Sequence, residues 1–238
     1  MPGEQTADPS ADTVQGDVLV AAGARPEFRL SRSLSVLSEP GSVQAEEIGA
    51  LRTHLLANHL RERRRSLMIS SASSDAGCTH VTVSIGLALA MAGVRTLIID
   101  ADMREPSLET FIHPETSVIG LRQCLEGDAA LLSTAICKDV IPGLSLLYSG
   151  GIAANPQELL SGANFKTLVT DCLRDFDLVL VDTPASSRCA DAQIVATILR
   201  YAIVVARRNV SFLSDIKLLI RELEGSGATV IGTFLSDV

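Results

Sequence analysis

The chain has 238 residues and a formal net charge of −8, and 47% of its residues are hydrophobic. It is long enough to bury one sizeable core, but it lacks the basic balance that broad binding to nucleic acid or to an anionic membrane needs. Only 3% of the residues are aromatic, so the core must be built from Ala, Val, Leu and Ile, which is typical of parallel strands covered by helices. The five cysteines form no CxxC pair or His/Cys cluster, and their odd number indicates reduced thiols in a cytosolic protein.

Residues 1–42 are predicted to be a mostly disordered tail, and residues 43–238 a single α/β domain. The first residues, MPGEQTADPSADT, have neither the basic nor the apolar region of a signal peptide. The stretch up to about residue 40 is rich in Pro, Gly, Ser, Ala and Asp, with weak periodicity. A short extended piece near Leu34–Leu37 is expected to dock on the domain.

The first predicted helix runs from Gln44 to His59, with Ser42 as its candidate N-cap. Its apolar positions recur at helical spacing; they are Ile48, Leu51, Leu55 and Leu56. Four arginines follow it, and a solvated helix end that complements the helix dipole is the simpler interpretation of them. A patch for an anionic partner is the alternative. The four are Arg61, Arg63, Arg64 and Arg65.

Short apolar runs then alternate with helical ones to the end of the chain. Strands are predicted at Ser66–Ser70, Arg95–Asp100, Leu144–Tyr148, Asp177–Val181, Ala202–Ala206 and Thr229–Phe234. Helices are predicted at Val81–Ala92, Ala163–Leu173 and Ser211–Glu224. This alternation favours right-handed βαβ units, and therefore a doubly wound, mostly parallel sheet with helices on both faces. The longest apolar run, Val81–Val94, is too short to cross a bilayer, so direct membrane insertion is not expected.

Three polar segments follow predicted strands at their carboxyl ends, where a parallel sheet collects them into one crevice. They are Ala72–His80, Asp100 with Asp102, and Asp182 with Thr183 and Pro184. The phosphate-binding pattern G-x-x-x-x-G-K-[ST] needs glycine for the turn, lysine for the phosphates and a hydroxyl for magnesium. It falls on Ala72–Thr79, where Gly77 and Thr79 are in place but Cys78 stands where lysine belongs. Alone, this loop is an ordinary turn between a strand and a helix.

Five ordered segments change that interpretation. They are ALRTHL, LIIDADMREPSL, NPQELLSG, FDLVLVDTPA and CADAQIV. Together they resemble the cytoplasmic domain of the bacterial tyrosine kinases (BY-kinases) of the capsular exopolysaccharide family, which is related to ParA and MinD. The resemblance runs from about Leu34 to Val238 and implies a P-loop NTPase-like fold of the ParA/MinD type.

The resemblance also implies a role for each part of the crevice. Ala72–Thr79 corresponds to the Walker A loop, Asp100 and Asp102 to the Walker A′ motif, and Asp182 to the Walker B acid. The residues implied to bind the nucleotide are Ala72, Gly77, Cys78, Thr79, His80 and Ser236. Those implied to bind magnesium are Thr79, Asp100 and Asp182. If the protein is active, the implied catalytic residues are Asp100, Asp102 and Asp182.

The departures from the family pattern gather where the phosphates of ATP would lie. Asp75 replaces a flexible glycine and adds a negative charge, while Cys78 removes the positive one. A charge-assisted hydrogen bond is worth about 1.5–3 kcal/mol, so the loss of the lysine alone weakens phosphate binding roughly ten- to a hundredfold. His80 is the substitute cation at hand, and a histidine is mostly neutral at neutral pH. The expectation is weak binding of ATP and magnesium, or none.

Three further family features are altered. In the family's oligomerisation motif Glu46 and Arg52 are kept, but Gly49 replaces the middle arginine, which weakens the case for a homo-oligomer through this helix. Ser236 stands where the family often has an asparagine that reads adenine. No tyrosine cluster follows the last predicted strand, so tyrosine autophosphorylation is not expected. Cys78 is interpreted as a small apolar filler, with a reactive thiol of lowered pKa at a helix N-terminus as the alternative.

The sequence therefore favours an interaction protein over an enzyme: a cytoplasmic pseudo-kinase in exopolysaccharide (capsule, slime or holdfast) synthesis, chain-length control or export. Its expected partner is a membrane polysaccharide co-polymerase (chain-length determinant protein), which would hold it at the inner membrane. One alternative is a weak ATPase or tyrosine kinase that uses the three acids with magnesium. The simpler interpretation of these three acids is that they are structural. Another is a partition or positioning ATPase, which would need an intact lysine loop. Nucleic-acid binding is not expected.

Overall fold

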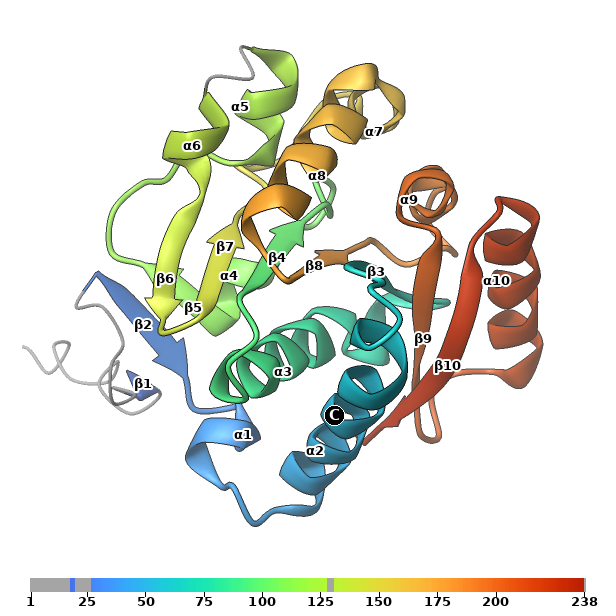
Figure 1. The fold of residues 1–238 in the computed structure, drawn as a ribbon. Coiled ribbons are helices and arrows are strands. Elements are labelled where there is room, and N and C mark those ends of the chain that lie inside the picture. The colour runs from blue at the N-terminus through green and yellow to red at the C-terminus, as the bar shows by residue number, and fades with distance from the viewer. Residues whose placement is uncertain (1–17, 20–26, 128–130, 238) are drawn as a thin grey trace, which may run out of the picture.

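The computed structural model describes residues 18–19, 27–127 and 131–237. Its main feature is a seven-stranded sheet with the strand order β10-β9-β3-β8-β4-β7-β6 (Figure 1). The strands are β3 (Ser66–Ser71), β4 (Thr96–Asp100), β6 (Cys137–Ile141), β7 (Leu144–Leu147), β8 (Leu178–Asp182), β9 (Tyr201–Arg207) and β10 (Thr229–Ser236). Only β6, which the sequence did not predict, runs antiparallel to its neighbour. The predicted doubly wound, mostly parallel sheet is confirmed.

Helices cover both faces of the sheet, because successive strand residues point to opposite sides. In β4, Leu97 and Ile99 pack into one core and Ile98 into the other. The first core lies under α5 (Leu121–Glu126), α6 (Leu132–Ala135), α7 (Pro156–Ser161), α8 (Ala163–Asp175), α9 (Asp191–Leu199) and α10 (Leu213–Gly225). The second lies under α1 (Ser35–Ser38), α2 (Val43–His54), α3 (Cys78–Met91) and α4 (Leu108–Phe111). No helix of the described part has the length and apolar character to cross a bilayer.

The packed domain begins before residue 43, so the predicted boundary is placed too late. A small antiparallel sheet joins β1 (Val18–Leu19), β2 (Phe28–Ser31) and β5 (Ile112–Pro114). Leu30 and Leu34 are fully buried in the second core, and α1 packs on α2 and α3. The piece near Leu34–Leu37 is thus docked as expected, but as a helical turn rather than an extended segment. The rest of the predicted tail lies outside the described residues.

The first predicted helix is present in two forms. Ser42 caps α2 by accepting a hydrogen bond from the Ala45 amide at 3.2 Å, as its position indicated. Beyond His54 the chain continues as a π-helix, Leu55–Leu60, which the periodicity could not distinguish from an α-helix. Of the arginines that follow, Arg64 lies 4.8 Å above the ring of Tyr201 and Arg65 donates to the Phe176 carbonyl.

The π-helix buries His59, which is 1% exposed and edge-on to Tyr201 with a centroid separation of 5.1 Å. Its Nε2 donates to the Ser66 carbonyl at 3.2 Å, while Nδ1 has no hydrogen-bond partner among the described residues. Burial lowers the pKa of His59 below its ordinary value. The folded protein therefore binds fewer protons at His59 than the unfolded chain does once the pH falls below about 6.5.

This gives a first expected result, in the dependence of stability on pH. Between pH 7.5 and 5, the wild type is expected to lose more unfolding free energy than His59→Gln, because only the wild type must keep this imidazole neutral. Urea unfolding followed by circular dichroism at several pH values measures the difference. The control is His113→Gln, at an exposed position, which should follow the wild type. Parallel curves for the wild type and His59→Gln would contradict the assignment.

Candidate functional site

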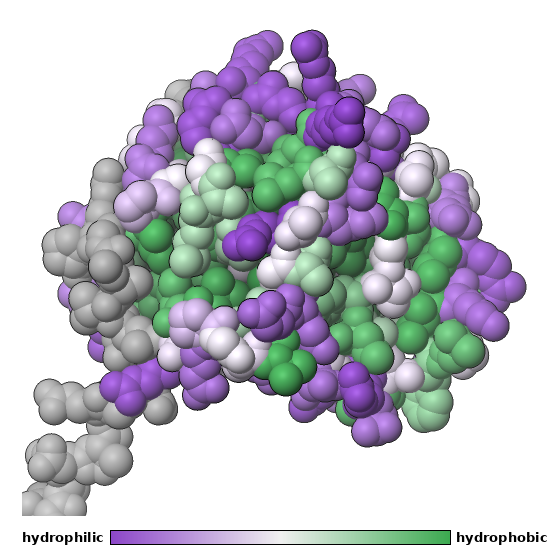
Figure 2. All heavy atoms as spheres, turned by 60° about the horizontal axis from the view of Figure 1, so that its bottom comes forward, coloured by the Kyte–Doolittle hydropathy of each residue, from purple (hydrophilic) through white to green (hydrophobic). Residues whose placement is uncertain are grey.

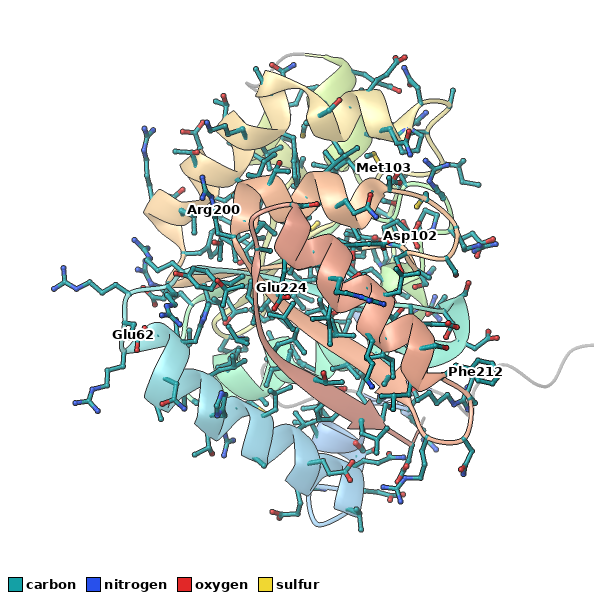
Figure 3. The ribbon with its side chains drawn as sticks, turned by 90° about the vertical axis from the view of Figure 1, so that its right-hand side faces the viewer. Glu62, Asp102, Met103, Arg200, Phe212 and Glu224 are labelled. Carbon is teal, nitrogen blue, oxygen red and sulfur yellow. The ribbon has the colours of Figure 1, made fainter. Side chains whose placement is uncertain are left out.

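The loops that follow β3, β4 and β8 meet at one end of the sheet and line a pocket of about 340 Å³. This is the crevice that the sequence predicted. Of the predicted residues, the pocket lining includes Gly77, Cys78, Thr79, His80 and Asp102. Asp102 is labelled in Figure 3, which views the molecule from its β10 and α10 side. Asp100 and Asp182 are each 1% exposed and lie beneath the lining.

The loop after β3 has the backbone of a phosphate-binding turn, although it lacks the lysine. Gly77 precedes α3 with a φ of +76°, a left-handed conformation that glycine adopts without strain. The first turn of α3 lines the pocket and has no side-chain cap. Arg207, at the end of β9, fastens the loop by donating to the carbonyl of Asp75 at 3.1 Å.

Asp182 is the centre of a buried hydrogen-bond cluster. Thr79 Oγ1 donates to Asp182 Oδ2 at 2.5 Å, and Thr82 Oγ1 donates to Oδ1 at 3.0 Å. Burial raises the pKa of Asp182 to about 6, although these donors and the thiol of Cys78 oppose the rise. Sequence reasoning missed Thr82, which lies one helical turn after Cys78 and Thr79 and therefore on the same side of α3.

Cys78 takes part in this cluster as a neutral thiol. It is 9% exposed and lies beside the Asp182 carboxylate. Burial and the Asp182 carboxylate raise the pKa of the Cys78 thiol well above its ordinary value. The alternative of a thiol with lowered pKa is therefore wrong. The thiol replaces the missing ammonium group with a hydrogen-bond donor that carries no charge.

The two acids after β4 have different surroundings. Asp100 Oδ1 accepts from the Asp102 amide at 3.0 Å, whereas Asp100 Oδ2 is buried without a hydrogen-bond partner among the described residues. Burial, followed by the charges of Asp182 and Asp102, raises the pKa of Asp100 well above its ordinary value. Asp102 faces the pocket, and its Oδ1 accepts from the amides of Arg104 and Glu105 at 3.0 and 2.9 Å.

An ion pair that the sequence analysis did not predict closes part of the rim. Arg188, from the loop after β8, pairs with Glu105, from the loop after β4. Arg104 adds no positive charge to the pocket lining, because it forms an ion pair at 2.8 Å with the fully buried Asp191. Arg188 is therefore the one Lys or Arg side chain among the described lining residues. Glu105 offsets it, and Asp75 and Asp102 leave the lining negative.

The charge of this lining differs from that of a P-loop that carries a lysine. Both carboxylate oxygens of Asp182 are engaged by hydroxyl groups, and Asp100 lies beneath the lining. Within the described ranges, no group of three or more His, Cys, Asp and Glu side chains is arranged to hold a metal ion. Magnesium in such sites is shared between one or two carboxylates and the phosphates, and here the phosphates would meet a negative lining without a lysine. We therefore derive no catalytic step through ATP.

Three other predicted residues lie at the edge of the pocket or outside it. Ala72 is buried, and its carbonyl accepts from the Ser187 amide at 3.2 Å. His80 lines the pocket, but its Nε2 donates to the Ser33 carbonyl at 3.0 Å, which ties it to the N-terminal segment. Ser236 is buried and lines a separate small hollow beside His80. The structure thus does not bring Ser236 into the predicted crevice.

The comparisons with known sequences point in one direction. No family model matches the chain. It is 30% identical over 177 residues to the tyrosine-protein kinase YwqD of Bacillus subtilis, which covers 74% of each chain. It is 28% identical over 203 residues to the putative tyrosine-protein kinase CapB of Staphylococcus aureus, covering 85% of this chain and 88% of CapB. It is 30% identical to the tyrosine-protein kinase Ptk of Acinetobacter johnsonii, but it spans only 29% of that longer protein.

Solved structures agree with these relatives. The kinase domain of the Escherichia coli tyrosine kinase ETK superposes with a TM-score of 0.77 at 27% identity, covering 85% of this chain and 79% of that one. The chimerical protein CapA2B2 gives a TM-score of 0.76 at 27% identity, covering 87% and 90%. The cell division ATPase MinD of Pyrococcus furiosus shares the fold, with a TM-score of 0.60 at 21% identity over 71% of this chain and 70% of MinD.

Proposed function

Because this chain belongs to the bacterial tyrosine-protein kinase family, we propose that it acts in bacterial exopolysaccharide synthesis as a kinase-like protein that has lost phosphoryl transfer. The observation that carries the proposal is the replacement of the phosphate-binding lysine by Cys78, a buried thiol whose pKa is raised by burial and by Asp182 and which is therefore uncharged. The lysine of a P-loop stabilises the charge that develops during phosphoryl transfer. The protein would then work by protein interaction rather than by chemistry.

The proposed partner is a membrane polysaccharide co-polymerase. Ptk and the Salmonella typhi kinase Wzc each contain the matching region as only 29% of a longer chain. CapB and YwqD, in contrast, match over most of their length. The matching region thus occurs among the relatives both as most of a chain and as part of a longer chain, which supports a function beside a second protein or region. We therefore place the protein in the cytoplasm, at the inner membrane through this partner.

A weak ATPase or kinase is the second candidate function, and one observation favours it. Thr79 and Asp102 line the pocket, and Asp182, beneath the lining, accepts a hydrogen bond from Thr79. A cation supplied by a partner could then stand in for the lysine. In that case the three acids Asp100, Asp102 and Asp182 would be catalytic, and magnesium would be shared between Thr79 and the acids.

Calorimetric titration and a phosphate-release assay on the full chain with Mg-ATP test the proposal. The expected result is no binding in the micromolar range and no turnover above the buffer rate. A tyrosine kinase with an intact lysine loop, assayed in parallel, confirms that the conditions support activity. Micromolar binding together with magnesium-dependent turnover that Asp102→Asn abolishes would overturn the pseudo-kinase and establish the weak enzyme.

A further inference from the structure

Exposed apolar side chains gather on one corner of the molecule. Nine large hydrophobic residues are exposed in the described part of the chain, and five of them lie on α10, on the loop before it or on β10. Phe212 is 73% exposed and Leu213 is 64% exposed. The five residues, which we call the α10 face, are Val210, Phe212, Leu213, Leu218 and Leu235.

Figure 3 looks onto this corner, with Phe212 at one end of α10 and Glu224 near the other. Figure 2, a view of a neighbouring side, shows hydrophobic side chains reaching the surface on its right, where α10 lies in Figure 1. Scattered surface hydrophobic residues are normal in a soluble protein, but a contiguous group marks an interaction site. The gathering of exposed hydrophobic side chains on the α10 face therefore indicates a surface to which another molecule binds.

The strand beside α10 is β10, which forms the edge of the sheet on the same side of the molecule. β10 is the last strand of the sheet and pairs only with β9 among the described residues. Its sequence, TVIGTFLS, contains neither a charged residue nor a proline. Natural proteins usually protect edge strands with such residues, because a bare edge offers its free N–H and C=O groups to another chain. Within the described residues, β10 thus has no strand along its outer edge at this corner.

The charges on α10 indicate which partner fits. Asp215, Leu218 and Arg221 follow one another at three-residue intervals, and all three are exposed. Neither Asp215 nor Arg221 forms an ion pair with another residue of the described ranges. If a second α10 packs antiparallel and centred on Leu218, Asp215 of each helix lies level with Arg221 of the other. Such a twofold contact is complementary to itself.

We propose that a second copy of this chain binds to the α10 face about a twofold axis near Leu218. The contact buries the apolar side chains of both copies and brings Asp215 and Arg221 together twice. It differs from the interface predicted from Glu46 and Arg52, which lie on α2, on the opposite face of the sheet. It also does not depend on whether the pocket binds a nucleotide.

Sedimentation equilibrium of the full chain over a range of concentrations tests this proposal. The wild type is expected to form a dimer, and Leu218→Asp is expected to raise its dissociation constant at least about tenfold, because two carboxylates replace the apolar centre. Asp215→Arg and Arg221→Asp, made singly, should each weaken the dimer by roughly tenfold through like charges. The exchanged double variant Asp215→Arg/Arg221→Asp should restore it, since both ion pairs form again with their signs reversed.

The control is Arg52→Ala on α2, which should leave the dimer unchanged. Circular dichroism and thermal unfolding show that each variant is folded, and the restored double variant guards against a trivial loss of structure. A monomer at every concentration would overturn the proposal, as would a dimer that Leu218→Asp leaves intact or that Arg52→Ala dissociates. If the exchanged variant stays as weak as the single ones, the α10 face binds a different protein and the twofold contact is wrong.

Discussion

Replacing Cys78 with lysine is expected to strengthen the binding of Mg-ATP by about ten- to a hundredfold. The turn around it already has the backbone of a phosphate-binding loop, with Gly77 in the left-handed conformation and the first turn of α3 uncapped. What the loop lacks is a positive charge, since Arg188 is offset by Glu105. A new ammonium group at position 78 would lie beside Asp182 and among the negative charges that now repel a triphosphate.

Titration calorimetry with Mg-ATP on the wild type and on Cys78→Lys measures the change. Cys78→Met is the matched control, because it adds a side chain of comparable length without a charge. Equal gains from lysine and methionine would show that the space at position 78, and not the charge, limits binding. Tight binding of Mg-ATP by the wild type would contradict the explanation that the missing positive charge at position 78 limits binding.

Replacing Leu34 with alanine is expected to lower the free energy of unfolding by about 2–5 kcal/mol. Leu34 is fully buried in the second core, in the short piece that the sequence analysis expects to dock within an otherwise disordered tail. A substitution in a disordered tail would leave stability unchanged. A docked and an undocked Leu34 therefore predict changes in the free energy of unfolding that differ by several kcal/mol.

Urea unfolding of the wild type and of Leu34→Ala gives this difference from the shift of the midpoint at constant slope. Val43→Ala, at a position 71% exposed, is the control and should change the free energy by less than about 0.5 kcal/mol. A Leu34→Ala variant as stable as the control would show that residues 27–42 add nothing to the core.

The parts of the fold that the sequence predicted best are those in which one local pattern dominates. All six predicted strands are present within two residues of their predicted bounds, because the sequences of buried parallel strands are short runs of apolar residues. β6 was missed because its sequence, CKDVI, has two charged residues in succession and so shows neither an unbroken apolar run nor a period-two alternation. In the N-terminal segment the docking near Leu34–Leu37 was predicted, but the burial of Leu30 was not, because three polar residues separate it from Leu34.

The site divides in a similar way. The sequence placed Thr79 and Asp182 in one crevice, because the loop before α3 and the acid that ends β8 both follow strands of the same parallel sheet. The Arg188–Glu105 ion pair joins two loops that are 83 residues apart, so no local spacing signals it. Ser236 was assigned because the family often has an asparagine there that reads adenine, whereas in the structure it ends β10 and lines the small hollow beside His80.

The hydrogen bond from His80 to the Ser33 carbonyl has a mechanical meaning. His80 belongs to the first turn of α3, next to Thr79 and Cys78, whereas Ser33 lies between β2 and α1. A tension applied to the N-terminal segment therefore acts directly on the turn that forms the floor of the pocket. The segment that carries Ser33 and the lining of the pocket thus share a direct hydrogen bond, through His80.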